Sequence, residues 1–118
     1  MRLMIVEDNS MMRTTIRRVV AGRKDIVLEC GDGDEAVSAY DSFRPDWVVM
    51  DYEMPRMDGI TAAEAIVKRY PDAHVLVVSH HDDADIRAAA VSAGARFVSK
   101  TRILQLKEII TTSAGERS

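Results

Sequence analysis

The sequence predicts a single α/β domain built on a doubly wound parallel sheet, and two observations lead to this class. Short, almost continuously apolar runs alternate five times with segments of helical spacing along the 118 residues. Strands that are covered on both faces have this continuous apolar character. The runs also recur at intervals of roughly 21 to 27 residues, the length of one strand–helix unit. With right-handed crossovers, five such units give a (βα)5 sheet with strand order 2-1-3-4-5.

The apolar runs and the segments between them give the expected elements in order. The strand candidates are Leu3–Val6, Ile26–Cys30, Trp47–Met50, His74–Val78 and Arg96–Ser99. In the first helical segment, apolar residues recur at three- and four-residue intervals from Met12 to Val20. The other four helices are expected over about residues 34–43, 59–70, 82–93 and 103–112.

Turn and cap residues support this division. The run GDGD at residues 31–34 is a turn that leads into a helix cap, and prolines follow the second and third helices. Gly94 stands where a C-cap glycine belongs, and Asp82 is the expected N-cap of the fourth helix. We therefore expect one domain over residues 1–112, followed by a polar tail over residues 113–118.

The composition is that of an ordinary globular domain, with 47% hydrophobic and 30% charged residues. A net charge of −3 without a Lys/Arg-rich block argues against a nucleic-acid surface. No apolar run has membrane-spanning length, and the first residues turn acidic too early for a signal peptide. The lone Cys30 excludes an internal disulfide and suits a reducing compartment, so we expect a cytoplasmic protein.

Polar side chains stand at the ends of four apolar runs: Glu7 and Asp8, Asp51, Ser79, and Lys100. The carboxyl ends of parallel strands share one edge of the sheet, where such sheets bind ligands. Three carboxylates suit Mg²⁺, and a carboxylate beside a metal can act as a nucleophile towards phosphorus. An ammonium group and a hydroxyl would then bind phosphoryl oxygens. A solvated loop, a surface cation or a cap would explain each residue singly, but not their joint placement.

Four segments carry a resemblance to a known family: IVEDN, PDWVVMDYEMPRMDG, VLVVS and AGARFVSK. From Met1 to about Thr112 the chain resembles the response-regulator receiver domain of two-component signalling, in particular that of chemotaxis regulators, either as a single-domain regulator or as part of a larger one. The resemblance implies a flavodoxin-like fold with Asp51 as the phosphoacceptor. It also implies the following roles: Glu7 and Asp8 as metal ligands together with Asp51 and the Glu53 backbone carbonyl, Ser79 as the switch hydroxyl, Phe97 as the switch aromatic, and Lys100 as the phosphate-sensing lysine.

The function implied by the resemblance is a signalling switch rather than a metabolic enzyme. A sensor histidine kinase or a phosphotransfer protein would donate the phosphoryl group in a Mg²⁺-dependent reaction, and slow self-dephosphorylation would end the signal. Ser79 would then move towards the phosphoryl group while Phe97 swings from exposed to buried. The partner would be a downstream protein target or an attached output domain, or a second copy in a phosphorylation-linked dimer. No direct nucleic-acid or membrane contact is expected.

Three positions depart from the family pattern. Thr101 stands where proline usually follows the lysine, so we expect a trans peptide bond there, because a cis bond without proline costs roughly 2.5–4 kcal/mol. His80 replaces the usual small residue and is expected to narrow access to Asp51 as a gate. His81 comes next, and with two aspartates it raises a weak case for a second metal site.

Three alternatives belong to other functional classes. A degenerate receiver would bind proteins without phosphorylation, although it would be expected to lack an acidic residue or the lysine. A phosphatase with an aspartate nucleophile would need a general acid two positions after Asp51, where Glu53 stands, and also a cap domain. A flavodoxin-like electron carrier would need a phosphate-binding loop after the first strand, where Glu7 and Asp8 would repel phosphate.

Overall fold

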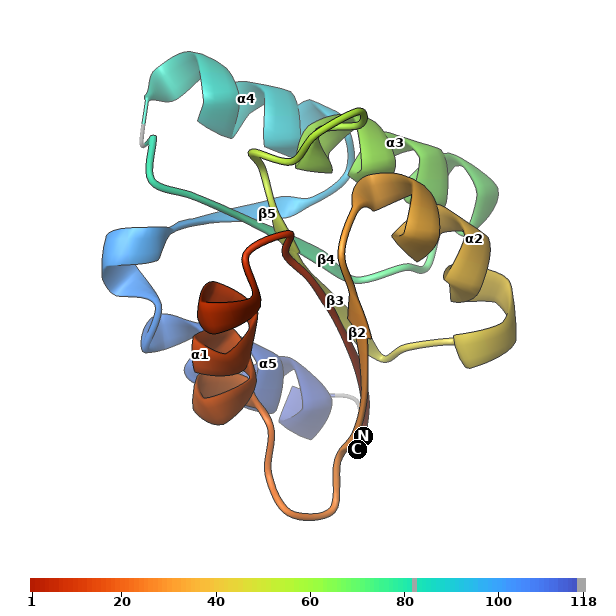
Figure 1. Cartoon of the computed structure of the whole chain (residues 1–118), viewed down its shortest axis with the longest axis vertical. Coiled ribbons are helices and arrows are strands. Elements are labelled where there is room, and N and C mark those ends of the chain that lie inside the picture. Colours follow the sequence, from red (N-terminus) through yellow and green to blue (C-terminus); the bar gives the residue numbers. More distant parts are fainter. Residues whose placement is uncertain (82, 117–118) are drawn as a thin grey trace.

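A computed structural model of the chain describes residues 1–81 and 83–116, and for residues 113–116 it describes the backbone only. It confirms the predicted doubly wound α/β fold, with five parallel strands in the order β2-β1-β3-β4-β5 (Figure 1). The strands are β1 (Arg2–Val6), β2 (Ile26–Cys30), β3 (Trp47–Asp51), β4 (Val75–Ser79) and β5 (Arg96–Ser99). The helices are α1 (Ser10–Val20), α2 (Gly33–Phe43), α3 (Gly59–Arg69), α4 (Ala84–Ser92) and α5 (Gln105–Glu116), with a short 3-10 helix η1 (Lys100–Arg102) before α5.

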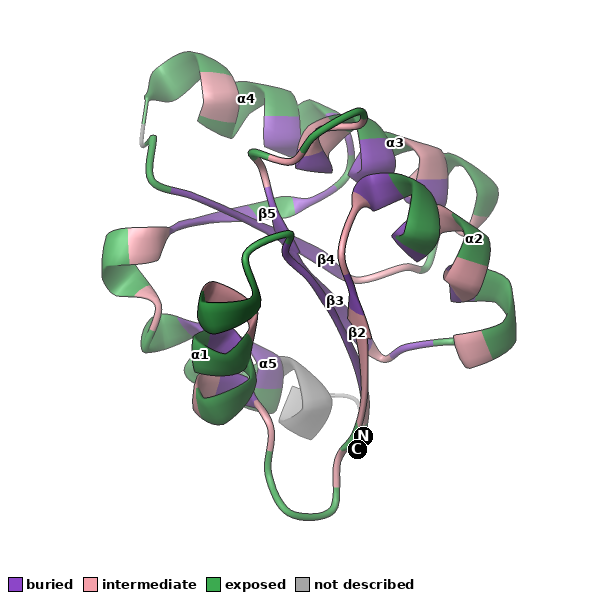
Figure 2. Cartoon of the chain, viewed as in Figure 1, coloured by how far each residue is buried: buried purple, intermediate pink, exposed green. Residues whose placement is uncertain are grey.

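Helices cover both faces of the sheet, which is why the strands are apolar throughout. Alternate residues of a strand point to opposite faces. In β1, Leu3 and Ile5 pack with α1 and α5, whereas Met4 and Val6 pack with α2, α3 and α4. All residues of β3 and β4 are buried, and Figure 2 shows this buried centre between the exposed outer faces of the helices.

Four helices begin with an Asx cap at the carboxyl edge of the sheet. Asn9, Asp32, Asp58 and Asp83 each accept a hydrogen bond from the backbone N–H three residues later, at 2.8–2.9 Å. Such caps satisfy N–H groups that have no partner within the helix. Because each helix starts where a strand has just ended, the N-termini of these helices surround the edge on which the predicted site lies.

The predicted N-cap of α4 was wrong. Asp83 caps the helix, which begins at Ala84, whereas Asp82 lies outside the described residues. At its other end, the predicted Gly94 cap is confirmed: Gly94 has φ +88°, its N–H donates to Val91 O at 3.0 Å, and Ala95 N–H donates to Ala90 O at 3.0 Å. This pair of bonds is a Schellman motif, which needs a left-handed residue at the position of Gly94.

The last helix also differs from its prediction. Residues 100–102 form η1, and a turn at Ile103 and Leu104 delays α5 until Gln105. The helix then continues to Glu116, through most of the segment expected to be a polar tail. Helical spacing alone did not separate the two helices, because Ile103, Leu106 and Ile110 share that spacing across the break. Within the described residues, no helix is long and apolar enough to cross a membrane.

Candidate functional site

Glu7 and Asp8 follow β1, and backbone contacts hold Glu7 in place. Its N–H donates to Cys30 O at 3.0 Å, and its carbonyl accepts from Arg13 Nη1 at 2.8 Å. The Glu7 side chain is only 2% exposed, whereas Asp8 is exposed. The sheet therefore places one carboxylate inside the fold and its neighbour at the surface.

Asp51 is the last residue of β3 and is 3% exposed. The loop after it returns at once, because Gly59 N–H donates to Tyr52 O at 2.9 Å. A Cβ at position 59 would stand 2.1 Å from the carbonyl oxygen of Asp51. Glycine is thus required at the first residue of α3, and this close approach fixes the backbone that carries Asp51.

Lys100 brings a buried cation to these carboxylates. Its Nζ forms an ion pair with Asp51 Oδ1 at 2.7 Å and donates a long hydrogen bond to Glu7 Oε1 at 3.4 Å. Residues that are 93 positions apart in the sequence therefore meet at one edge of the sheet, as predicted.

A cavity of about 550 Å³ opens over this group of charges. Its lining contains six of the predicted residues: Glu7, Asp8, Asp51, Glu53, His80 and Lys100. Met11 and Met12 of α1 line it as well. Met12 packs partly against the core, whereas Met11 is 81% exposed.

Ser79 and Phe97 are missing from the described lining of the cavity. Ser79 is buried at the end of β4, where its Oγ accepts from His81 N–H at 2.9 Å. Phe97 is only 9% exposed, with the Arg87 guanidinium 4.7 Å from its ring centre. The expectation that Phe97 is exposed before phosphorylation is therefore wrong for this structure: the ring already packs among core residues between β5 and α4.

The pKa values follow from burial and from the charges in contact. Burial, and then the adjacent Asp51, raise the pKa of Glu7 from 4.5 to about 8, while Lys100 acts in the opposite direction. For Lys100, burial by itself lowers the pKa, but contacts with Asp51 and Glu7 outweigh it and the pKa is raised. The site therefore stabilises the lysine as a cation and holds a proton on Glu7 near neutral pH.

The acidic residues have the chemistry of a divalent cation site. Glu7, Asp8 and Asp51 each offer an oxygen, and these oxygens all lie within 4.8 Å of one another. Glu7 Oε2 is buried and, among the described residues, has no hydrogen-bond donor. An orphaned buried carboxylate oxygen is costly unless a cation or a proton compensates it. Hard oxygen ligands of this kind suit Mg²⁺.

Of the three residues that depart from the family pattern, only His80 is among the described lining residues of the cavity. His80 is exposed and lines it, while its expected role as a gate stays a prediction. His81 Nε2 lies 2.6 Å from Glu53 Oε1, a link between the loops after β4 and β3 that the sequence did not indicate. No peptide bond in the described chain is cis, in agreement with the trans bond expected before Thr101.

The sequence did not predict that Gly59 and Arg13 support the site. Gly59 was visible as part of the DG turn signal, but its contact with the Asp51 carbonyl was not. Arg13 carried no signal, because its role depends on how α1 lies across β1 and β2: Nη1 binds the Glu7 carbonyl and Nε pairs with Glu29 at 3.1 Å.

Comparisons with known proteins agree with the fold. The chain is 36% identical over 102 residues to the chemotaxis protein CheY of Listeria monocytogenes, covering 85% of this chain and 86% of CheY. It is 32% identical over 96 residues to the transcriptional regulatory protein DegU of Brevibacillus brevis, covering 80% of this chain but only 41% of DegU. The chain thus spans less than half the length of DegU.

Among solved structures, the fold resembles a chain from the CheX–CheY–BeF3–Mg²⁺ complex of Borrelia burgdorferi. The TM-score is 0.77 at 26% identity, covering 88% of this chain and 84% of that one. The family model for the response regulator receiver domain matches residues 3–111, nearly the whole chain. With its (βα)5 topology and its charged strand ends, the chain belongs to the response regulator receiver domain family of two-component signalling.

Proposed function

We propose that this receiver domain accepts a phosphoryl group on Asp51 from a histidine kinase or a phosphotransfer protein, in a Mg²⁺-dependent reaction. The observation that carries the proposal is the buried contact between Lys100 and Asp51 at 2.7 Å, at the base of a cavity that Glu7 and Asp8 also line. A buried carboxylate with a cation in contact and an open approach has what a phosphoryl acceptor needs.

The residues of the chain have distinct parts in the transfer. The Asp51 carboxylate attacks phosphorus, and its new P–O bond forms as the P–N bond to the histidine of the donor breaks. Lys100, which neutralises Asp51 in the resting state, then neutralises a phosphoryl oxygen as a point charge. The capped N-termini of α1 and α3 face the same edge and add partial positive charge near the new anion.

Glu7, Asp8 and Asp51 would hold the metal ion, and the family resemblance adds the Glu53 carbonyl as a ligand. When bound, Mg²⁺ supplies positive charge that offsets the charge of the carboxylates and the phosphoryl oxygens. The similar CheY of Borrelia burgdorferi has been solved with Mg²⁺ and BeF3, which supports this choice of metal.

Ser79 is the proposed switch. Its Oγ accepts from His81 N–H, so its own hydroxyl proton is free to be donated to a phosphoryl oxygen. A movement of Ser79 towards that oxygen would break the bond to His81 and reshape the loop between β4 and α4. Because Phe97 is already buried, we place the response to phosphorylation in this loop rather than in a rotation of the Phe97 ring.

The proposed role is that of a switch that other proteins read, with self-phosphorylation and slow self-dephosphorylation as its only reactions. The donor would approach over Met11, which is 81% exposed beside the cavity. The reader would be a target protein, a second copy or an attached output domain, without direct nucleic-acid or membrane contact. The buried, unpaired Cys30 supports a cytoplasmic location.

The test is phosphorylation by acetyl phosphate or phosphoramidate with Mg²⁺, followed by the intact mass of the protein. The proposal predicts a gain of one phosphate that is lost in EDTA and lost in Asp51→Asn, a nearly isosteric change that keeps the fold. His80→Ala should speed labelling or dephosphorylation if His80 is the gate. No gain of mass in the folded wild-type chain would favour a binding module that works without phosphorylation.

A further inference from the structure

A second cavity lies at the opposite edge of the sheet, between the last turns of α1, the loop to β2 and the start of β2. It has a volume of about 490 Å³ and shares no lining residue with the cavity over Asp51. Arginines dominate its polar lining, which comprises Thr14, Arg17, Arg18, Arg23 and Asp25. Nothing in the phosphorylation chemistry uses these residues.

The positive charge of this cavity is only partly compensated. Arg17 pairs with Glu29 at 2.7 Å, but in the described part of the chain the guanidinium groups of Arg18 and Arg23 form no hydrogen bond or ion pair, and both residues are exposed. Asp25 is the one acid in the lining, and both of its oxygens are engaged. Oδ1 pairs with the amino group of Met1 and Oδ2 accepts from Gly22 N–H, each at 2.7 Å. Two guanidinium groups are therefore available to an anionic ligand.

The apolar lining residues of the cavity indicate what kind of anion would fit. Ala21 and Val27 are half-buried, pack on the core beneath α1 and α5, and give the cavity an apolar part. A ligand with a carboxylate on a short apolar stem, such as a glutamate side chain, matches an apolar surface beside guanidinium groups. Arginine also binds carboxylates through two parallel hydrogen bonds, which lysine cannot do.

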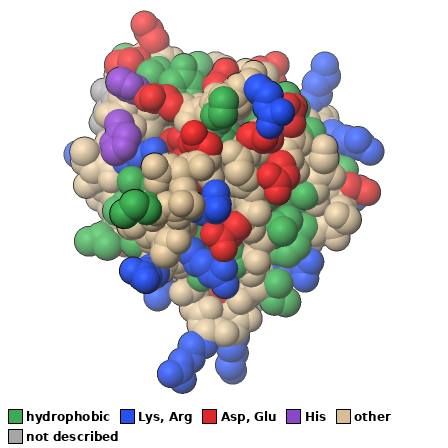
Figure 3. Space-filling view, viewed as in Figure 1, with side chains coloured by type: hydrophobic (Ala, Val, Ile, Leu, Met, Phe, Trp, Pro, Cys, Tyr) green, Lys and Arg blue, Asp and Glu red, His purple; other side chains and the backbone are tan. Residues whose placement is uncertain are grey.

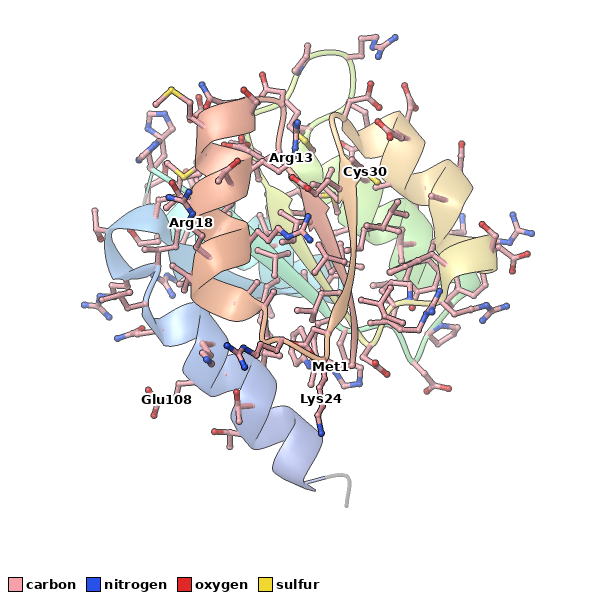
Figure 4. The ribbon with its side chains drawn as sticks, turned by 60° about the horizontal axis from the view of Figure 1, so that its bottom comes forward. Met1, Arg13, Arg18, Lys24, Cys30 and Glu108 are labelled. Carbon is pink, nitrogen blue, oxygen red and sulfur yellow. The ribbon has the colours of Figure 1, made fainter. Side chains whose placement is uncertain are left out.

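The surroundings extend the positive charge beyond the cavity. Figure 4 labels Arg18 on α1 and Lys24 at the end of the molecule formed by the loop to β2. Lys107 of α5 is close enough to Asp25 to interact with it electrostatically. Figure 3 shows blue Lys and Arg side chains at this lower end, whereas red acidic side chains gather on the upper part of the same face.

We propose that this basic cavity docks an acidic segment of a partner protein. Nucleic acid fits less well, because no aromatic side chain lines the cavity and the net charge of the chain is −3. An anionic membrane fits less well too, because such surfaces attract larger clusters of basic residues than the cavity offers. The docking site would leave the cavity over Asp51 free, so one partner can be held while another donates or reads the phosphoryl group.

The test is binding of a fluorescein-labelled oligoglutamate peptide to the full chain, measured by anisotropy without any phosphoryl donor. We expect saturable binding that weakens as salt is added, because exposed charge pairs are screened. Arg18→Ala/Arg23→Ala should weaken binding about fivefold or more. The control Arg96→Ala/Arg102→Ala removes the same charge from exposed sites outside the cavity and should keep the wild-type affinity. Amide chemical shifts should move over residues 14–27.

Several results would overturn the proposal. The cavity is not the site if the control weakens binding as much as the test variant, or if the shifts map elsewhere, while both variants keep the wild-type melting curve. Absence of saturable binding at low salt also refutes it. Tighter binding of a DNA duplex or of phosphatidylserine vesicles, lost in the same test variant, would replace the acidic segment with that ligand. None of these results depends on whether Asp51 is phosphorylated.

Discussion

Glu7 shows how the fold creates an unusual acid out of an ordinary one. It is held by the backbone of β2 and by Arg13, so its side chain cannot turn to solvent. Burial beside Asp51 then makes its charged form costly, and the single cation Lys100 does not offset that cost. The buried Glu7 side chain is stabilised either when it is protonated or when its carboxylate binds a metal ion. Because a proton and a metal ion compete for the same carboxylate, pH and metal binding are linked.

The raised pKa of Glu7 predicts how stability depends on pH in EDTA. The value is about 8 in the folded chain against 4.5 ordinarily, so only the folded state holds this proton between those values. The stabilisation is complete below the unfolded value and is lost as the pH rises through the folded one. The free energy of unfolding from urea titrations should fall with rising pH over this window, by at most about 1.4 kcal/mol per pH unit from this group.

Glu7→Gln is the matched variant, because the amide resembles the protonated acid at every pH. Its unfolding free energy should fall less across the same window and exceed that of the wild type at the alkaline end. Mg²⁺ should stabilise the wild-type chain more at high pH than at low pH, since a metal ligand must be deprotonated. Parallel profiles for the two proteins in EDTA would show that Glu7 carries no raised pKa.

Cys30 gives a second prediction at this scale. Burial, with smaller contributions from Glu35 and Asp32, raises the pKa of its thiol to about 12. Because the thiolate is the reactive form, the folded chain should resist iodoacetamide near pH 8 and react at once in denaturant. Mass spectrometry over time measures this directly. Alkylation of the native chain as fast as that of a small thiol would mean that Cys30 is neither buried nor perturbed.

Among the elements, the loop from β3 to α3 matters most to the site, because it begins at Asp51 and ends on Gly59. Arg56 within this loop has φ 69° and pairs with Asp32, the cap of α2. The loop is thus tied at its middle to a neighbouring helix and at its end to the backbone of Asp51. A substitution at Gly59 would therefore displace the backbone of the predicted phosphoacceptor, Asp51, without altering any charged side chain.

Gly59→Ala tests this coupling. The new Cβ would lie 2.1 Å from the Asp51 carbonyl oxygen, so the backbone must move either at residue 59 or at Asp51. We expect a loss of about 3 kcal/mol in unfolding free energy, at the upper end for overpacking, and slower phosphorylation of the chain that remains folded. Gly31→Ala is the control, because its nearest contact would be 3.8 Å away, and it should change stability by no more than about 0.5 kcal/mol. Equal stabilities for the two variants would contradict the close approach.

The same elements show what the sequence could predict. The five strands followed from apolar runs that both faces of the sheet bury, and β2 and β5 match their predicted bounds. The start of α5 did not follow, since Ile103 in the turn before it has the same apolar spacing as Leu106 and Ile110 inside the helix. Strand ends predicted which charges would meet. No local sequence pattern predicts the burial of Phe97 beneath Arg87 or the contact between His81 and Glu53. Both depend on how α4 and the loops after β3 and β4 pack in the folded chain.

As a whole, the molecule separates its functions along the strand direction. The carboxyl edge holds the buried acids, Lys100 and the capped helix starts, whereas the amino edge holds the basic cavity with Arg18 and Arg23. The parallel sheet keeps the two cavities apart, because all its strands begin at one edge and end at the other. Partners can therefore address the two edges independently.

We expect the assembly of buried acids and Lys100 to direct the phosphoryl group to Asp51 and not to the acids beside it. The most direct measurement is to phosphorylate the chain with acetyl phosphate and Mg²⁺, reduce the acyl phosphate with borohydride, and locate the reduced residue by tandem mass spectrometry. We expect reduction at Asp51 alone. Reduction at Glu7 or Asp8 instead, or a phosphorylated chain in which Asp51 is unchanged, would contradict it.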